Sequence, residues 1–344
     1  RAYQQMLRYI IRRSLVAIPT LIVISFILFF IMDQAPGDPT SNVPLTVPAE
    51  VRERMREAQG FNDPFILQWL KWCRLMFINE PINLFESLTG TCFGSCESRD
   101  RIISWSSRSP ALDTIYERLP QTLWVLGLGT LFGTLIAIPV GIMSAYKQYS
   151  LFDNVGTFIS MIGFSMPVFF TGLLAIVVFS VKLKWFPSFY DTTHDVQFTS
   201  WSSIWIQIKQ LVMPVSILTL FQASSLARFT RASALDNLNQ EYVRTARSKG
   251  LSESKVINVH VMRNSLIPVV TLLALTIPGV IGGAIITETV FRINGIGQLL
   301  ITSIRNGDVP MVQTITFFSA FLVVLFNLIA DALYGLLDPR IRYE

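Results

Sequence analysis

The residues of this sequence that could do chemistry are few, and their spacing matches no common catalytic site. Neither a His-Glu-x-x-His motif nor a phosphate-binding G-x-x-x-x-G-K-[ST] motif is present. Two histidines cannot hold a zinc ion by themselves, and no Ser/His/Asp set is suggested. We therefore expect no catalytic, metal or nucleotide site in this chain.

One segment, residues 228–268, is long, polar and basic and lies between two strongly apolar stretches. Its cationic side chains are Arg228, Arg231, Arg244, Arg247, Lys249, Lys255 and Arg263, against Asp236, Glu241 and Glu253. The residues before Gly250 contain no helix breaker and predict a short helix. Gly250 suits the end of that helix, where a left-handed residue is needed. Ser252 can then accept from backbone N–H groups and begin the next helix.

Composition places the chain in a membrane. Of its 344 residues, 51% are hydrophobic and 15% charged, and its mean hydropathy is +0.48. Apolar blocks of about 20 residues are long enough to span a bilayer, and six are predicted, at 14–32, 121–145, 156–181, 206–227, 265–287 and 314–337. The net charge of +5 is no sign of nucleic-acid binding, because the basic residues cluster beside span ends.

Charge asymmetry predicts the topology. An Arg-rich start and the basic segment 228–263 put both termini and that segment in the cytoplasm. We expect three regions: 1–32 with the first span, 33–118 as a large outer segment, and 119–344 as a core of five spans that carries the basic loop. The first span has no small-residue cleavage site, so we interpret it as a retained anchor.

The outer segment is expected to hold two helices, at 48–60 and 61–78, followed by a loop over 79–112. The aromatic and aliphatic residues of 61–78 either pack on the spans or lie along a membrane surface; they are Phe65, Leu67, Trp69, Leu70, Trp72 and Met76. Cys92 and Cys96 could pair across their short turn on an oxidising face, with free thiols as the alternative.

Several residues inside the spans are polar or break helices. Gly129 and Gly133 form a small-residue face that favours close helix packing within the chain. Ser165, Met166 and Pro167 interrupt the third span, and Gln222 and Ser225 lie in the least hydrophobic one; both groups are candidates for a translocation path, with kinked packing as the alternative. Glu288 is either an outer anchor or part of a gate.

A transporter without a nucleotide site takes its energy from an ion gradient or from an attached ATPase. Gradient-driven carriers usually need several carboxylates inside the membrane, and here Asp331 is nearly alone. An ATPase partner is therefore favoured. The rival hypotheses are a secondary transporter or channel, and a scaffold that transports nothing.

The segment YVRTARSKGL followed by HVMRNSLIP resembles the EAA loop of permease subunits in ABC importers, in the dipeptide/oligopeptide/nickel branch. The Glu and first Ala of the general motif are replaced by Arg244 and Thr245. Similar stretches occur at 9–39, 165–174, 182–187, 286–300 and 336–343, so that the resemblance covers nearly the whole chain outside about 78–112.

This resemblance implies a type I ABC importer permease in the bacterial inner membrane, all-α with six transmembrane helices, that carries di- or oligopeptides, with nickel or another small solute as the alternative. The implied partners are a second, similar permease, two cytoplasmic ATPases that hold ATP and Mg, and an external solute-binding protein. It also implies a coupling helix over 241–250 that contacts the ATPases. The residues assigned to it are Glu241, Tyr242, Val243, Arg244, Thr245, Ala246, Arg247, Ser248, Lys249 and Gly250, with Leu251 following.

Overall fold

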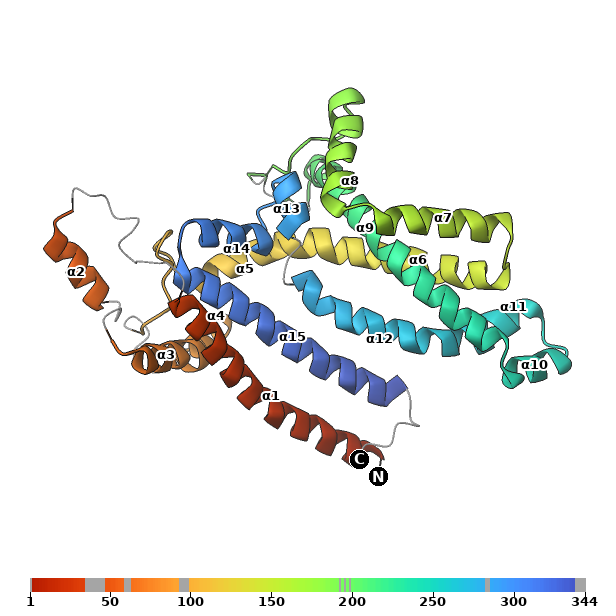
Figure 1. Cartoon of the computed structure of the whole chain (residues 1–344), viewed down its shortest axis with the longest axis horizontal. Coiled ribbons are helices and arrows are strands. Elements are labelled where there is room, and N and C mark those ends of the chain that lie inside the picture. Colours follow the sequence, from red (N-terminus) through yellow and green to blue (C-terminus); the bar gives the residue numbers. More distant parts are fainter. Residues whose placement is uncertain are drawn as a thin grey trace. The chain divides into compact units, whose positions relative to one another are not determined.

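Figure 1 shows the computed structural model of the chain, which describes residues 2–34, 47–58, 63–92, 99–191, 193–194, 196–197, 199–281 and 285–337. Every regular element in these ranges is a helix, apart from a single β-bridge between Ile103 and Pro110. The prediction of an all-α chain is confirmed. The chain divides into two compact units, which are described one at a time. The first comprises Arg1–Ile10, Pro120–Gln298 and Leu325–Glu344, and the second comprises Ile11–Leu119 and Leu299–Val324.

In the part of the chain that the structure describes, five helical stretches are long and apolar enough to cross a membrane: Ile11–Asp33, Ala111–Tyr146, Trp201–Leu238, Glu253–Thr276 and Val309–Ile329. The pair Leu151–Ser165 and Val168–Lys182 passes the same test jointly. Counted as one span, this pair brings the total to the six predicted. The interruption predicted at Ser165, Met166 and Pro167 of the third span is confirmed as a break, because the helices on its two sides meet at an angle of 101°.

The second unit contains most of the segment between the first two spans. Its helices are α1 (Ala2–Asp33), α2 (Ala49–Ala58), α3 (Phe65–Arg74), the π-helical η1 (Leu75–Asn79), α4 (Glu80–Thr89) and the first part of α5 (Ala111–Thr122). Parts of α14 (Ile296–Arg305) and α15 (Val309–Leu337) complete it. The prediction of a loop over 79–112 is wrong in its first third, because α4 lies there. The helix is capped by Gly90, which has a left-handed φ of 66°.

Aromatic residues hold α3 against α1 and α15 inside the second unit. Phe65 packs edge-on against Phe26, with ring centroids 5.7 Å apart, and Trp72 packs against Phe317 of α15 at 5.2 Å. Trp72 and Met76 are buried. The packing alternative is therefore confirmed for Phe65, Trp72 and Met76.

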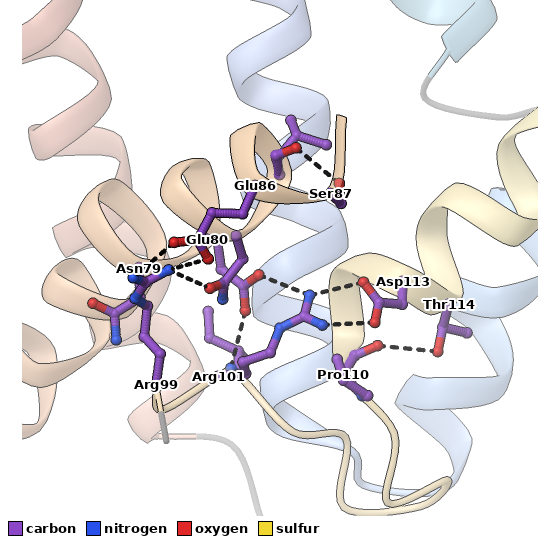
Figure 2. Close-up of polar contacts among 12 residues, drawn as sticks. Asn79, Glu80, Glu86, Ser87, Arg99, Arg101, Pro110, Asp113 and Thr114 are labelled. Carbon is purple, nitrogen blue, oxygen red and sulfur yellow. Dashed lines mark hydrogen bonds and ion pairs between the residues drawn. The ribbon is translucent and has the colours of Figure 1, made fainter. Parts of the chain in front are cut away.

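Two arginines join α4 to the chain that follows it (Figure 2). Arg101 donates two hydrogen bonds of 2.7 Å to Asp113 and one of 3.0 Å to Glu80, whose side chain is buried. Arg99 makes a bidentate pair with Glu86, at 2.7 and 3.1 Å. The hydrogen bonds to Asp113 are the main cause that raises the pKa of Arg101. These charge-assisted bonds fix the connection between α4 and α5.

The first unit contains the remaining helices. They are η2 (Leu123–Gly127), α6 (Leu128–Tyr146), α7 (Leu151–Ser165), α8 (Val168–Ala175), η3 (Ile176–Lys182), α9 (Trp201–Leu238), α10 (Glu241–Ser248), α11 (Glu253–Lys255), η4 (Val256–Val261), α12 (Met262–Ile281) and α13 (Ile285–Phe291).

Glycines let α6 and α7 approach α9 closely. A Cβ atom on Gly129 would lie 2.7 Å from the Cβ of Leu218, and one on Gly133 would lie 2.7 Å from the Cβ of Gln222. On α7, a Cβ on Gly163 would lie 2.2 Å from Ser224 Oγ. Real side chains do not approach so closely, so these positions require glycine. The predicted small-residue face on α6 is confirmed as packing within the chain.

Candidate functional site

The basic segment folds as predicted into a short helix with a glycine-terminated end. Helix α9 ends at Leu238, and two residues later the extended Gln240 begins α10, its carbonyl accepting from Val243 N at 3.0 Å. At the other end Gly250 has φ +75°. Leu251 N donates to Ala246 O and Gly250 N to Arg247 O, the two bonds of a Schellman motif. The chain direction is therefore fixed on both sides of α10.

Helix α10 has one buried face and one exposed face. Val243 is fully buried and Ala246 is 5% exposed. They pack in one cluster with Ile142 and Ala145 of α6, Ala234 of α9, and Val256, Ile257 and Val261 of η4. The remaining residues from Glu241 to Gly250 are exposed, and the Arg244 side chain is 81% exposed. Helices α6, α9 and η4 thus pack against one face of α10, and its opposite, cationic face is exposed.

The turn after α10 is closed by an ion pair. Arg247 Nη2 lies 2.7 Å from Glu253 Oε1 across the Gly250 turn. The hydrogen bond to Glu253 is the main cause that raises the pKa of Arg247. The cap expected from the Ser252 side chain is wrong: its backbone carbonyl, not its hydroxyl, accepts from Lys255 N at 2.9 Å.

A second ion pair, Asp153–Arg231, ties α7 to α9 close to α10. Arg231 Nε and Nη2 lie 2.7 and 2.8 Å from the two carboxylate oxygens of Asp153. The Asp153 side chain is only 3% exposed and also accepts from Tyr149 N at 3.0 Å. The sequence analysis had placed Arg231 in the basic segment but had not found its partner. Asp153 lies in the first turn of α7, directly after the turn at Lys147, and an acidic residue at that helix start was the available signal.

Two serines, Ser233 and Ser265, join α9 to α12. Ser233 Oγ donates to Ser265 O at 3.0 Å, and Ser265 Oγ lies 3.4 Å from Ser233 O. Ser265 is fully buried. Helices α9 and α12, on either side of the basic segment, are therefore hydrogen-bonded to each other.

The residues proposed for a translocation path lie in two places. Ser165 ends α7, while Met166 and Pro167 are extended and separate it from α8; Met166 N still donates to Ile162 O at 3.1 Å. Gln222 lies against Gly133 of α6, and Ser225 is half-buried on the same helix, α9. Their role in a path stays a prediction.

Glu288 is neither an exposed anchor nor a surface residue, because its side chain is fully buried. Its carboxylate accepts from Thr122 Oγ1 at 3.0 Å and from Gln298 N at 2.9 Å, and Thr122 Oγ1 accepts in turn from Ile296 N. Glu288 thus caps the first turn of α14, where a negative charge is favoured. Helix α14 begins directly after Gly295.

Two other predictions concern residues that lie partly outside the described part of the chain. Cys92 is disulfide-bonded and Cys73 carries a free thiol, but Cys96 lies outside the described residues, so its pairing with Cys92 stays a prediction. Asp331 belongs to α15, with its side chain outside the described part.

Replacing Gly250 by Val should loosen the end of α10. No atom lies within 4 Å of a Cβ added at Gly250, so the cost comes from the left-handed backbone alone, about 1–2 kcal/mol. We expect limited proteolysis to cleave the 248–252 turn faster in this variant. Gly127→Val is the matched control, since Gly127 also has open surroundings but a helical φ of −61°. Equal cleavage rates in the two variants would contradict the assigned turn.

Comparison with known proteins places these features in a family. Residues 137–343 match the family "Binding-protein-dependent transport system inner membrane component", and residues 6–126 match its N-terminal region. The chain is 39% identical over 339 residues to the oligopeptide transport system permease protein AppB of Bacillus subtilis, covering 98% of this chain and 100% of AppB. It is 32% identical to the dipeptide transport system permease protein DppB of Alkalihalophilus pseudofirmus, covering 98% of this chain and 100% of DppB.

A solved structure supports the fold. The inward-facing MetNI methionine ABC transporter has a chain with a TM-score of 0.52 and 17% sequence identity, covering 66% of this chain and 97% of that chain. At this identity the likeness concerns the fold alone. It confirms the expected type I permease architecture.

Proposed function

The chain belongs to the family of binding-protein-dependent transport system inner membrane components, the permease subunits of ABC importers, and from this we propose that it carries di- or oligopeptides inward. Two relatives named for oligopeptide and dipeptide transport, each matched over nearly the whole chain, support the peptide substrate. The chain is a multi-pass protein of the inner membrane. We propose that both of its termini face the cytoplasm, because basic residues favour that side and an even number of predicted spans separates the Arg-rich start from the basic segment 228–263.

The observation that carries the mechanism is the two-sided helix α10. Its exposed cationic face is available to a cytoplasmic ATPase, and its buried face is anchored to α6, α9 and η4. A partner that moves α10 must therefore move these helices with it, because packed interiors transmit displacement. The partner would bind ATP and Mg and hydrolyse the ATP, and this chain would supply the helices that move.

The Asp153–Arg231 pair extends this motion to α7. Helix α7 ends at the 101° break before α8, where Met166 and Pro167 leave the helical conformation. Broken helices inside membrane proteins commonly line a path or cavity. Displacement of α9 would thus reach the break through α7, which gives hydrolysis a route to the proposed path.

The complete transporter would contain this chain, a second similar permease, two ATPases and an external peptide-binding protein. To test it, the assembly is reconstituted in liposomes with ATP inside and labelled dipeptide and binding protein outside. We expect uptake that requires ATP, binding protein and this chain. Uptake by this chain alone without ATP would overturn the proposal, as would ATP-dependent uptake that persists when the chain is omitted.

The exposed face of α10 gives a sharper test of ATPase docking. Reversing Arg244 and Lys249 to Asp leaves the buried face untouched and should weaken binding of the ATPase by roughly tenfold, about 1.4 kcal/mol. Lys147→Asp, an exposed cation on the α6–α7 turn, is the control and should bind normally. Binding is measured by co-purification at graded salt. Unchanged binding after the double reversal would place the docking surface elsewhere.

A further inference from the structure

The second unit contains a helical run that none of the six spans includes. Residues Phe65–Thr89 form α3, η1 and α4 without interruption. One side of the run packs on α1 and α15 through Phe65, Trp72 and Met76, and another presents Glu80 and Glu86 to Arg101 and Arg99 (Figure 2). A third side carries large apolar residues that the chain leaves exposed.

The contacts of α3 with α1 show how deep in the membrane the helical run Phe65–Thr89 lies. Trp69 Nε1 donates to Ser25 Oγ at 3.3 Å, and Ser25 Oγ lies 4.0 Å from Cys73 Sγ. Ser25 precedes Asp33, the end of the apolar span, by eight residues, which is about 12 Å along a helix. The span Ile11–Asp33 is about 34 Å long, little more than the roughly 30 Å hydrocarbon core of a bilayer. Trp69 and Cys73 therefore lie beside membrane-embedded residues.

Helix α15 gives a second and independent measure of depth. Phe317 packs against both Trp72 and Phe77, with ring centroids 5.2 and 5.3 Å apart. Phe317 follows Val309, the start of another apolar span, by eight residues, again about 12 Å. Measured from the ends of two different spans, the α3–η1 junction therefore lies at the same depth in the membrane, about 12 Å.

The side of α3 and η1 that faces away from both spans carries three large apolar residues: Ile66 is 53% exposed, Leu70 is 51% and Ile78 is 54%. The exposed cations Lys71 and Arg74 lie beside them, and their long side chains can extend toward the headgroups while their stems stay in the apolar layer. On α1, the large apolar residues Val23, Ile27, Phe30 and Ile31 are also exposed, and they span the level of Ser25 and the residues from there toward Asp33. These α1 residues belong to a membrane span and meet lipid tails. An apolar surface at the same depth has the same natural solvent.

We propose that α3 and η1 are a non-spanning membrane helix, with Ile66, Leu70 and Ile78 in contact with the acyl chains of the leaflet at the Asp33 end of α1. On the proposed topology this is the outer leaflet. Helix α4 returns to the membrane surface, where Glu80 and Glu86 meet Arg101 and Arg99. The segment between the first two spans is therefore partly embedded in the bilayer and is no free outer domain. This inference depends on the chain spanning the membrane and is independent of the substrate.

Spin labels test this directly in the assembled transporter in lipid nanodiscs. Cysteines are introduced singly at Ile66, Leu70 and Ile78 in a Cys73→Ser background and labelled without reductant; the background lacking an introduced cysteine is measured as the blank. Collision with oxygen, which concentrates in lipid, is compared with collision with a water-soluble nickel chelate. We expect oxygen to dominate at all three sites. A label at Ser107, exposed in the loop before α5, is the control and should show the reverse.

Two results would overturn the proposal. Dominant collision with the nickel chelate at Ile66, Leu70 and Ile78 would show that this side faces water. Immobile labels that neither reagent reaches would show that a protein, such as the partner permease or the binding protein, covers it. Peptide uptake is measured on the same labelled samples, so that a transport defect is separated from a wrong assignment of lipid contact.

Discussion

Asp153→Ala should separate ATP hydrolysis from peptide uptake. The substitution leaves Arg231, whose side chain is 28% exposed, without its bidentate partner. Removing one member of a buried pair costs about 3–5 kcal/mol, and the partial exposure of Arg231 puts the expected loss near the lower limit, about 3 kcal/mol. Because α7 then loses its ion pair with α9 and keeps only its packing on that helix near Gly163, a displacement of α9 and α10 reaches the α7–α8 break less completely. We expect the ratio of peptide imported to ATP hydrolysed to fall severalfold.

Three further variants distinguish this role from simple instability. Exchanging the charges, with Asp153→Arg and Arg231→Asp together, should restore part of the ratio, which a general loss of packing would not allow. Asp236→Ala is the control: Asp236 is a carboxylate on the same helix, α9, and is exposed. Asp153→Asn keeps the shape and removes the charge. If Asp153→Ala lowers the amount of complex and leaves the ratio of import to hydrolysis intact, the pair only stabilises the fold.

The sequence predicted the parts of this fold that depend on composition and local geometry. Apolar blocks of about 20 residues identified the spans, since a bilayer imposes that length. Gly250 was predicted because a helix end that needs a left-handed residue strongly favours glycine. The glycine face of α6 was predicted for the same reason, that only a small residue admits a neighbouring backbone.

What the sequence could not predict depends on contacts between distant residues. Asp153 and Arg231 are 78 residues apart, and Thr122 and Glu288 are 166 apart. Each residue alone fits a surface loop or a span end equally well. The α7–α8 break was visible as Pro167, but its size was not, because a proline allows anything from a small kink to a full break. Helix α4 was missed because its polar residues are satisfied by arginines far along the chain.

Glu288→Ala should be among the most destabilising single changes in the first unit. It removes the acceptor for Gln298 N and Thr122 Oγ1 at a site that is fully buried, and it leaves a cavity. The loss of buried acceptors costs about 1–3 kcal/mol and the cavity adds to it, so that we expect roughly 3–5 kcal/mol. The measurement is the denaturation midpoint of the purified complex in mixed micelles. Glu288→Gln, which keeps the volume and one acceptor oxygen, should lose about half as much.

Gly295→Ala tests the same site by adding volume, whereas Glu288→Ala removes it. The new Cβ would lie 2.4 Å from Glu288 Oε1 and 2.5 Å from Thr122 Oγ1, and neither atom can move away without breaking its hydrogen bond. Overpacking of this kind costs about 1–3 kcal/mol. If Glu288 holds the start of α14 as described, the two substitutions act on one contact, so that Gly295→Ala should cost much less in a Glu288→Ala background than in the native chain. Additive losses would show that Gly295 and Glu288 act separately, and the carboxylate cap on α14 would then be the wrong explanation for the burial of Glu288.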